Sequence, residues 1–363
     1  MSSTWNNNIG FTVFGESHGP AIGVVMDNVP PGESIDLDKI YQFMARRAPK
    51  QNKTSTQRKE KDMPQIMSGY FNGKTTGTPL CALIANTDQH SQDYSNLSRL
   101  ARPGHADYTG ALRYRGFNDV RGGGHFSGRL TAPLCFAGAV AGQILEKRGI
   151  YVGAHIAEIH GIKDKAFDPI NTTKDMIREV REKEFPTIID VQGNEMIKEI
   201  DKARKDKDSV GGIIECIAIN VPAGIGSPLS FRLVKSSPQF IFGIPAVKGL
   251  EFGAGFKVAE MTGSENNDEF YVNDKGHVVT KTNNHGGILG GIASGMPITL
   301  RVAFKPTPSI ARPQATVDYS AMKNETLEVK GRHDPCVVPR AVPCVEAAVN
   351  IALLNHMLEY PNF

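Results

Sequence analysis

The sequence has few cysteines, little net charge and no long apolar run, and each of these shortages excludes a class of protein. Its five cysteines are scattered without a C-x-x-C pair, which excludes a disulfide framework and a zinc finger. A formal net charge of +3 over 363 residues argues against a surface that coats nucleic acid. The longest apolar stretch, residues 130–145, contains Thr131, Pro133 and Gln143 and is shorter than the roughly 18 residues that span a bilayer. We therefore expect buried, reduced thiols in a protein that does not enter a membrane.

The N-terminus and the composition predict a cytoplasmic, turn-rich protein. The first ten residues, MSSTWNNNIG, carry neither a basic n-region nor an apolar h-region, so we expect no secretory signal. The 37 glycines and 22 prolines predict many tight turns and exclude a helical bundle. Because there is no repeat, low-complexity linker or composition break, we predict one domain over residues 1–363.

Hydrophobic periodicity predicts a mixture of strands and amphipathic helices. Residues 9–27 indicate two strands joined by the loop GESHGP, which places Ser17 and His18 at a strand end. Asp36 and Ser127 are candidate helix N-caps. Helices are predicted from Asp36 to Arg47 and over residues 129–147, 172–185, 192–208 and 344–358, and further strands over 210–221 and 229–234.

Arginine is concentrated between residues 99 and 129, where there is no lysine. The arginines are Arg99, Arg102, Arg113, Arg115, Arg121 and Arg129. A guanidinium group binds carboxylate and phosphate oxygens in bidentate fashion, so this set indicates a site for a polyanionic small molecule. Solvated surface arginines or a subunit interface remain the alternative.

The run Arg121-Gly-Gly-Gly-His-Phe-Ser-Gly-Arg129 leads directly into a predicted helix. Free backbone N–H groups before a helix can hold an anion, and glycines let that anion come close. The run is neither a Walker A motif nor G-x-G-x-x-G after a strand. A glycine-rich turn that serves close packing is the alternative.

Three histidines lie in loops beside glycine or proline, namely His18, His105 and His333. Histidine can donate a proton at neutral pH, so each is a candidate general acid. Ser17 is an unfavourable nucleophile, because G-E-S-H-G is not the G-x-S-x-G elbow and adjacent residues on a strand face opposite sides. The segment HIAEIH lacks the H-E-x-x-H spacing, so we predict no metal site.

Eight longer strings follow one another along the chain: GESHGPAIG, RPGHADYTGALRYRGFNDVRGGG, SGRLTAPLCFAGA, GLEFGAGF, GSENND, GGILGG, KPTPSI and GRHDPCVVPRA. Together they resemble the successive signatures of the chorismate synthase family, from about residue 10 to residue 350. The resemblance implies a lyase that eliminates phosphate and a ring hydrogen from 5-enolpyruvylshikimate 3-phosphate to give chorismate. It also implies reduced FMN as cofactor, with NADPH as a conceivable reductant of the flavin. The implied fold is α+β, a single domain in which antiparallel β-sheets sandwich a layer of helices, assembled as a homotetramer.

The resemblance also implies roles for individual residues. His18, with its neighbour Ser17, matches the histidine that protonates the departing phosphate, His105 the histidine near flavin N1, and Asp334 the aspartate that assists proton removal through flavin N5. The implied substrate ligands are Arg47, Lys53, Arg129 and Arg340. The implied FMN ligands are His125, Phe126, Ser127, Pro245, Ala246, Gly290, Lys305, Pro306, Thr307, Pro308, Ser309 and Arg332.

The chain departs from the commoner family pattern at His125 and Phe126, where arginine and serine are frequent, at Lys53, where arginine is frequent, and at Pro245, where asparagine is frequent. These changes remove an arginine at 125, a hydroxyl at 126 and a side-chain hydrogen bond at 245 from the expected flavin contacts. Two other functions stay open at this point. One is a phosphatase acting on the same substrate, and the other is an RNA-binding or anion-binding protein that uses the basic stretch 46–61.

Overall fold

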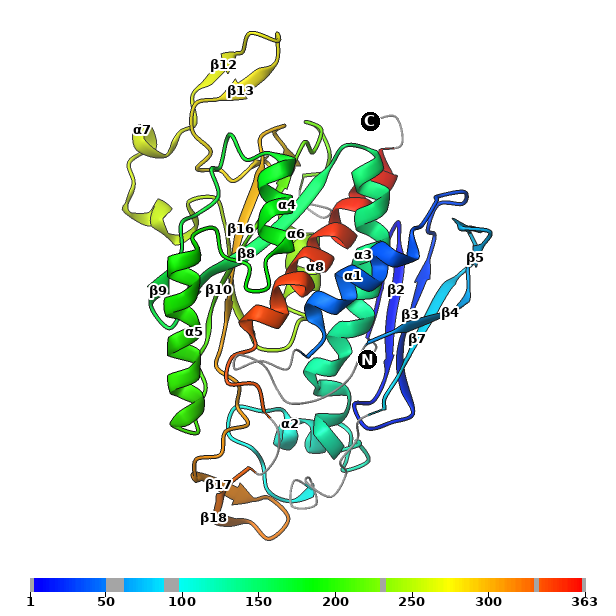
Figure 1. Ribbon diagram of the computed structural model, residues 1–363, viewed down its shortest axis with the longest axis vertical. Helices are drawn as coiled ribbons and strands as arrows, with labels where there is room; N and C mark the ends of the chain where they lie inside the picture. The colour runs from blue at the N-terminus through cyan, green and yellow to red at the C-terminus, as the bar shows by residue number, and fades with distance from the viewer. Residues whose placement is uncertain (1–2, 50–61, 88–97, 229–232, 330–332, 361–363) are drawn as a thin grey trace.

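The computed structural model of the protein describes residues 3–49, 62–87, 98–228, 233–329 and 333–360 (Figure 1). Two predicted site residues, Lys53 and Arg332, lie outside these ranges, as does most of the strand predicted at 229–234.

Two five-stranded antiparallel sheets flank a set of helices (Figure 1). In the first sheet the strand order is β1-β2-β3-β7-β4, with bounds Thr4–Asn6, Gly10–Gly15, Ala21–Asp27, Leu80–Ala85 and Pro64–Ser68. In the second sheet the order is β11-β16-β10-β8-β9, with bounds Val247–Phe252, Ile298–Phe304, Gly212–Ile219, Tyr151–Ile159 and Ile162–Lys163. The expected mixture of helices and antiparallel sheets is confirmed.

The helices between the sheets carry the apolar core. Helix α3 (Thr131–Lys147) packs on β3 and β7 of the first sheet, while α8 (Val338–Glu359) packs on β8 and β10 of the second. Helix α1 (Leu37–Arg47) packs against both, and α4 (Lys174–Glu182) and α5 (Asp190–Lys205) pack against β8. The remaining helices are α2 (Asp107–Arg113), α6 (Leu233–Ile241), α7 (Gly263–Asn266) and the 3-10 turns η2 (Arg121–Phe126), η3 (Gly128–Leu130) and η5 (Gly255–Glu260).

Four short two-stranded ribbons complete the described chain. They pair β5 with β6 (Tyr70–Phe71, Lys74–Thr75), β12 with β13 (Phe270–Val272, Val278–Thr280), β14 with β15 (Ile288–Leu289, Ile292–Ala293) and β17 with β18 (Gln314–Asp318, Lys323–Leu327). The β12–β13 ribbon projects from the body of the molecule (Figure 1).

Most predicted elements are confirmed, including the Asp36 cap, whose carboxylate accepts from the N–H groups of Asp38 and Lys39. The strand predicted at 229–234 is wrong in its last two residues, which begin α6. A short apolar run does not distinguish a strand from a buried helix. Helix α8 begins at Val338, six residues before the predicted start.

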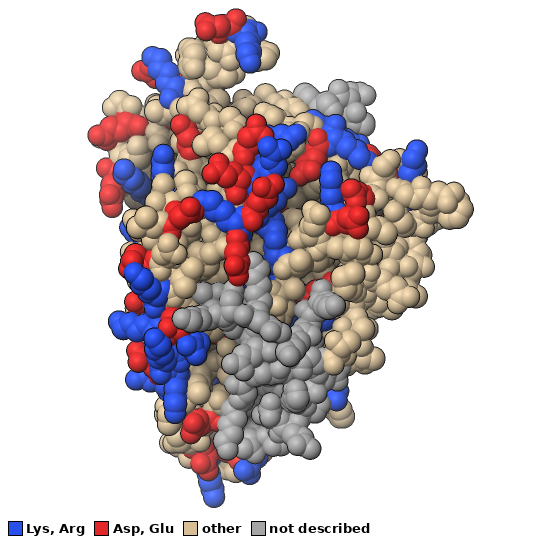
Figure 2. Space-filling model, in the orientation of Figure 1, with Lys and Arg blue, Asp and Glu red and all other residues tan. Residues whose placement is uncertain are grey.

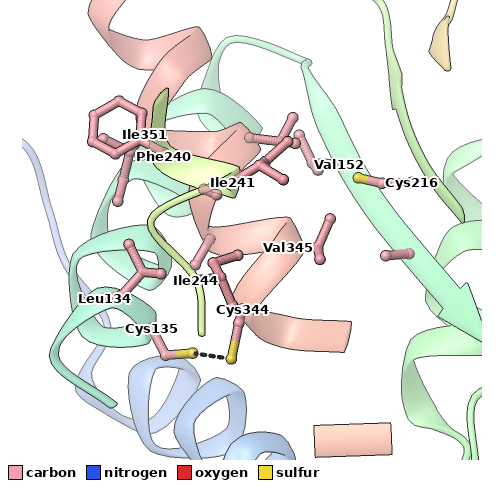
Figure 3. Packing of buried hydrophobic residues seen from close by; sticks show 14 of the residues in the cluster. Leu134, Cys135, Val152, Cys216, Phe240, Ile241, Ile244, Cys344, Val345 and Ile351 are labelled. Carbon is pink, nitrogen blue, oxygen red and sulfur yellow. Dashed lines mark hydrogen bonds between the residues drawn. The ribbon is translucent and has the colours of Figure 1, made fainter. Parts of the chain in front are cut away.

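Helix α8 is the one helix in the described part of the chain that is long and apolar enough to cross a membrane. However, 94% of its apolar window is buried inside the protein, as expected of a core helix. It lies close to α3 at Gly138, where an added Cβ would lie 2.2 Å from the Cα and Cβ atoms of Ala347. Figure 3 shows the side chains that fill the space around this crossing.

A histidine held between two carboxylates is buried in the second sheet. The ring of His155 is fully buried, with Nδ1 3.1 Å from Asp164 Oδ2 and Nε2 2.7 Å from Glu215 Oε2. Burial opposes the charge on this ring, but the two carboxylate hydrogen bonds outweigh burial and raise the pKa of His155.

Replacing His155 is therefore expected to alter how stability depends on pH. A histidine whose pKa is raised by folding contributes its full stabilisation at pH values below its pKa in the unfolded protein, which is about 6.5. This contribution is lost as the pH rises through the pKa of the folded protein, at up to about 1.4 kcal/mol per pH unit. Denaturant unfolding of wild type and His155→Gln at several pH values should show their difference shrinking as pH rises above 6.5. The exposed His160→Gln variant is the control, and a constant difference for His155→Gln would contradict the prediction.

Candidate active site

A cavity of about 540 Å³ opens where the ends of several elements meet. It lies between the C-terminus of α1, the η2 and η3 turns, the first turns of α3 and α8, the segment after α6 and the loop after β16. It is lined by these predicted site residues: Arg47, His105, His125, Phe126, Ser127, Arg129, Pro245, Ala246, Lys305, Thr307, Pro308, Ser309, Asp334 and Arg340. Among the described residues, the cationic side chains of the lining are those of Arg47, Arg102, Arg129, Lys248, Lys305 and Arg340, and the single carboxylate is that of Asp334. Such a lining suits a polyanionic ligand.

Three successive glycines lie beside this site, and the first of them is part of the cavity wall. Gly122, Gly123 and Gly124 have φ values of 58°, 85° and 53°, a region that side chains other than glycine rarely adopt. Gly122 lines the cavity, and a Cβ there would lie 2.2 Å from both Cε1 and Nδ1 of His18. The absence of a side chain at position 122 thus lets the buried His18 ring lie directly behind the cavity wall.

Ser17 and His18 follow the end of β2 and are both buried. Their side chains lie on the same side, with His18 Nδ1 3.3 Å from Ser17 Oγ. The expectation that they would face opposite sides is wrong, because the chain has left the strand and turns there. The Ser17 N–H instead donates to the Gly124 carbonyl at 3.2 Å, which ties this turn to the glycine run.

A methyl group at position 122 is expected to displace the His18 ring. We predict that Gly122→Ala lowers kcat by about 10²-fold, the typical cost of a misplacement of about 1 Å at a catalytic group. The matched control is Gly116→Ala, because Gly116 also has a positive φ (79°) but no atom within 4 Å of the added Cβ. Steady-state kinetics of the two variants, with unfolding curves for each, separate displacement from backbone strain. Equal losses in both would contradict the prediction.

Two of the predicted substrate ligands share one buried carboxylate. Asp62 Oδ2 accepts from Arg47 Nη1, and Asp62 Oδ1 accepts from Arg129 Nη1. Arg47 Nε also donates to Thr131 Oγ1 at 3.0 Å, and Arg129 Nε donates to Asn86 Oδ1 at 3.0 Å. Burial disfavours the charge on Asp62, but the two guanidinium groups outweigh burial and hold the pKa of Asp62 below its usual range. The arginines are therefore fixed in place and charged before any ligand arrives.

A second carboxylate holds His105. Asp107 accepts from Arg102 Nε and Nη2, both at 2.7 Å, and its Oδ1 lies 2.8 Å from His105 Nδ1. Although burial disfavours its charge, the hydrogen bonds from Arg102 and His105 keep the pKa of Asp107 well below its usual range. An ionised carboxylate only accepts hydrogen bonds, so the proton of the His105 ring is on Nδ1. In the neutral ring Nε2 is then the acceptor.

Asp334 and Arg340 form an ion pair at the start of α8, with Asp334 Oδ2 2.5 Å from Arg340 Nη1. Arg340 Nε donates to the Arg47 carbonyl at 3.1 Å, which connects the beginning of α8 to the end of α1. These contacts bring together one predicted proton-transfer residue and two predicted substrate ligands.

The predicted cofactor residues in the lining make contacts of their own. His125 Nδ1 donates to the Gly15 carbonyl at 2.8 Å, and Ser127 Oγ caps η3 by accepting from the Arg129 N–H. The Phe126 ring packs against Gly110, where a Cβ would lie 2.7 Å from the ring. Lys305 Nζ donates to the Gly104 carbonyl.

The chain is similar to proteins of one family over almost its whole length. The family model described as chorismate synthase matches residues 9–358. The chain is 48% identical over 351 residues to a chorismate synthase of Pyrococcus abyssi, covering 96% of each chain. It is 47% identical over 349 residues to one of Korarchaeum cryptofilum, covering 95% of this chain and 94% of the relative. The chain belongs to the chorismate synthase family.

A solved structure entitled "Crystal Structure of Chorismate Synthase" has the same fold, with a TM-score of 0.74 and 28% identity, over 97% of this chain and 92% of that one. Four of the eight sequence strings that resemble the chorismate synthase family contribute residues to the cavity lining, namely RPGHADYTGALRYRGFNDVRGGG, SGRLTAPLCFAGA, KPTPSI and GRHDPCVVPRA. Six residues carried over from that family are not among the described residues that line the cavity. Ser17 and His18 lie behind Gly122. Gly290 lies in the exposed β14–β15 turn, Pro306 is not among the lining residues, and Lys53 and Arg332 lie outside the described residues.

Sequence reasoning missed Asp62 and Asp107, the two carboxylates that hold the arginines and His105. Asp107 belongs to the string RPGHADYTG and follows His105 by two residues, which is a usable signal for a histidine partner. No local motif marks Asp62. Among the described residues, no group of three His, Cys, Asp or Glu side chains is placed to hold a metal ion.

Proposed function

We propose that the protein catalyses the chorismate synthase reaction, the 1,4-elimination of phosphate and a ring hydrogen from 5-enolpyruvylshikimate 3-phosphate. It is a carbon–oxygen lyase acting on a phosphate ester. The observation that carries this proposal is one cavity, built from motifs far apart in sequence. Its lining has six cationic side chains and one carboxylate among the residues that the structure describes. A substrate with two carboxylates and a phosphate needs such a lining.

The chain's own residues have separable tasks in this proposal. Arg47, Arg129 and Arg340, together with Lys53, bind the carboxylates and the phosphate of the substrate. His18 donates a proton from its ring to the departing phosphate, and Ser17 orients that ring through the contact at Nδ1. Loss of the phosphate breaks the C–O bond, and the departing anion is neutralised by the proton and the guanidinium groups.

The residues present fit a flavin phosphate and ring in the same cavity. Thr307 Oγ1 is buried in the lining and has no hydrogen-bond partner among the described residues, so it is available to a ligand. When bound, reduced FMN supplies electron density transiently to the breaking C–O bond. We propose that these residues hold it: His125, Phe126, Ser127, Pro245, Ala246, Lys305, Thr307, Pro308 and Ser309, with Gly290, Pro306 and Arg332.

Two further residues manage protons near the flavin in this proposal. His105 donates Nδ1–H to Asp107, so its Nε2 atom would be the ring nitrogen that faces the flavin if the cofactor were bound in the cavity. Asp334 would be the carboxylate that takes up the proton removed from the substrate ring. Its ion pair with Arg340 keeps the Asp334 carboxylate oriented in the cavity.

An anaerobic assay tests the proposed function. Purified protein is mixed with 5-enolpyruvylshikimate 3-phosphate and chemically reduced FMN, and phosphate and chorismate are followed together. Equal amounts of both, formed only when the flavin is reduced, are the expected result. Phosphate without chorismate would identify a phosphatase, and the absence of both products would also overturn the proposal. A parallel reaction with NADPH and oxidised FMN measures whether the protein reduces its own flavin.

An RNA-binding function has no support in the comparisons. Figure 2 shows Lys and Arg side chains intermingled with Asp and Glu over α4. Most of the basic stretch 46–61, on which the RNA-binding alternative depends, lies outside the described residues. A basic, one-signed surface is the usual footprint of nucleic-acid binding.

We also propose a cytoplasmic homotetramer in which residues 1–363 form one domain. One cluster of buried apolar residues extends through both sheets and the helices between them, which supports the single domain. The projecting β12–β13 ribbon exposes Phe270, Tyr271, Val272 and Val278, with Phe270 62% exposed, which supports a subunit contact there.

A further inference from the structure

Two cysteine thiols lie together beside the active-site cavity. Cys135 in the second turn of α3 and Cys344 in the second turn of α8 are buried, and their Sγ atoms are 3.7 Å apart (Figure 3). Cys344 also lines the cavity, and its Sγ is 3.5 Å from the Arg340 carbonyl. The other cysteines, Cys81, Cys216 and Cys336, form no such thiol pair.

The helix crossing explains why the two sulfur atoms meet. Gly138 and Ala347 lie one turn further along their helices, and a Cβ on Gly138 would overlap Ala347. Because Gly138 has no side chain, the two helix backbones are close at that position. The side chains one turn earlier, Cys135 and Cys344, therefore face each other directly. A disulfide requires such an approach, with Cα atoms about 4.4–6.8 Å apart.

The surroundings make the two sulfur atoms chemically different. The hydrogen bond from Cys135 and the positive charge of Arg47 lower the pKa of Cys344. Burial raises the pKa of Cys135 well above its usual value. Cys344 is therefore the sulfur that ionises first, and it is the one that borders the cavity, through which a small oxidant arrives.

We propose that Cys135 and Cys344 are an oxidisable dithiol that hydrogen peroxide converts to a disulfide at the edge of the active site. The Cys344 thiolate attacks a peroxide oxygen, the O–O bond breaks, and a sulfenic acid forms with release of water after proton transfer. The Cys135 thiol then attacks the Cys344 sulfur, the S–S bond forms and a second water leaves. Peroxide gains the two electrons that the two thiols lose, so the step is balanced.

The proposed function supplies an oxidant at the right place, although the dithiol chemistry does not depend on it. Dioxygen oxidises reduced flavins and is itself reduced to hydrogen peroxide, so aerobic turnover would generate peroxide in the cavity that Cys344 lines. The disulfide would then join α3 to α8 within two turns of Arg129 and Arg340.

The test is mass spectrometry of the folded full-length protein after treatment with hydrogen peroxide, without flavin. We expect a mass loss of about 2 Da, a Cys135–Cys344 cross-linked peptide, and a fall from five free thiols to three after denaturation. A protein that keeps all its thiols, or gains about 16 or 32 Da at Cys344 without a cross-link, would overturn the proposal. Because this readout needs no turnover, it is independent of whether the protein makes chorismate.

Single substitutions test the order of the two steps. In Cys135→Ser, Cys344 should stop at the sulfenic acid and be labelled by dimedone. In Cys344→Ser, Cys135 should remain a free thiol under the same treatment. The matched control is Cys216→Ser, which removes a fully buried thiol without a thiol partner and should still form the cross-link. A dimedone adduct on Cys135 in Cys344→Ser would contradict the assigned order.

Discussion

His18→Ala is expected to slow phosphate release by about 10²–10⁴-fold, the range for removal of a general acid, while FMN binding stays nearly intact. The physical reason is that the buried His18 ring lies behind the Gly122 wall, outside the part of the lining assigned to the flavin. Single-turnover phosphate release under anaerobic conditions, with flavin binding followed by fluorescence, measures both effects. His277→Ala in the exposed β12–β13 turn is the control. Full activity in His18→Ala would remove this residue from the mechanism.

Asp62→Asn is expected to lower the free energy of unfolding by about 3–5 kcal/mol, the usual cost of removing one partner from a buried ion pair. Arg47 and Arg129 would then be two buried charges without a carboxylate between them. Asparagine tolerates the left-handed backbone of Asp62 (φ 50°), so the change isolates the charge.

Inorganic phosphate should restore part of the stability that Asp62→Asn loses, because an anion in the cavity can take over the role of the carboxylate. Urea unfolding with and without phosphate measures both effects. The control is Asp119→Asn, whose ion pair with the half-exposed Arg121 should contribute less than about 1 kcal/mol. If Asp62→Asn is no less stable than Asp119→Asn, the two arginines do not depend on Asp62.

The sequence predicted the local elements well because their signals are local. The Asp36 cap, the loop after the first strand pair and the glycine run before α3 each depend on residues within a few positions of one another. The arginine-rich segment 99–129 was only a partial guide to the cavity. Arg102 and Arg129 line it, whereas Arg99, Arg113, Arg115 and Arg121 are not among the lining residues.

Contacts made by the tertiary fold could not be predicted in the same way. Asp62 is 67 positions from Arg129 in the sequence, and no spacing rule connects them. Ser17 and His18 were assigned to opposite faces because their turn was treated as a strand, and only the fold shows them side by side behind Gly122. The cysteines likewise looked scattered, although α3 and α8 bring two of them together.

The crossing of α3 and α8 has a consequence for how variants of this protein will be interpreted. Both helices begin at the cavity, and Gly138 lies about two turns into α3, buried and remote from any ligand. A larger residue there would push apart the two helix ends that carry Arg129 and Arg340. A mutational scan scored by growth would therefore class Gly138 with the ligand-binding residues, and a scan scored by protein abundance would be needed to tell a shifted scaffold from lost chemistry.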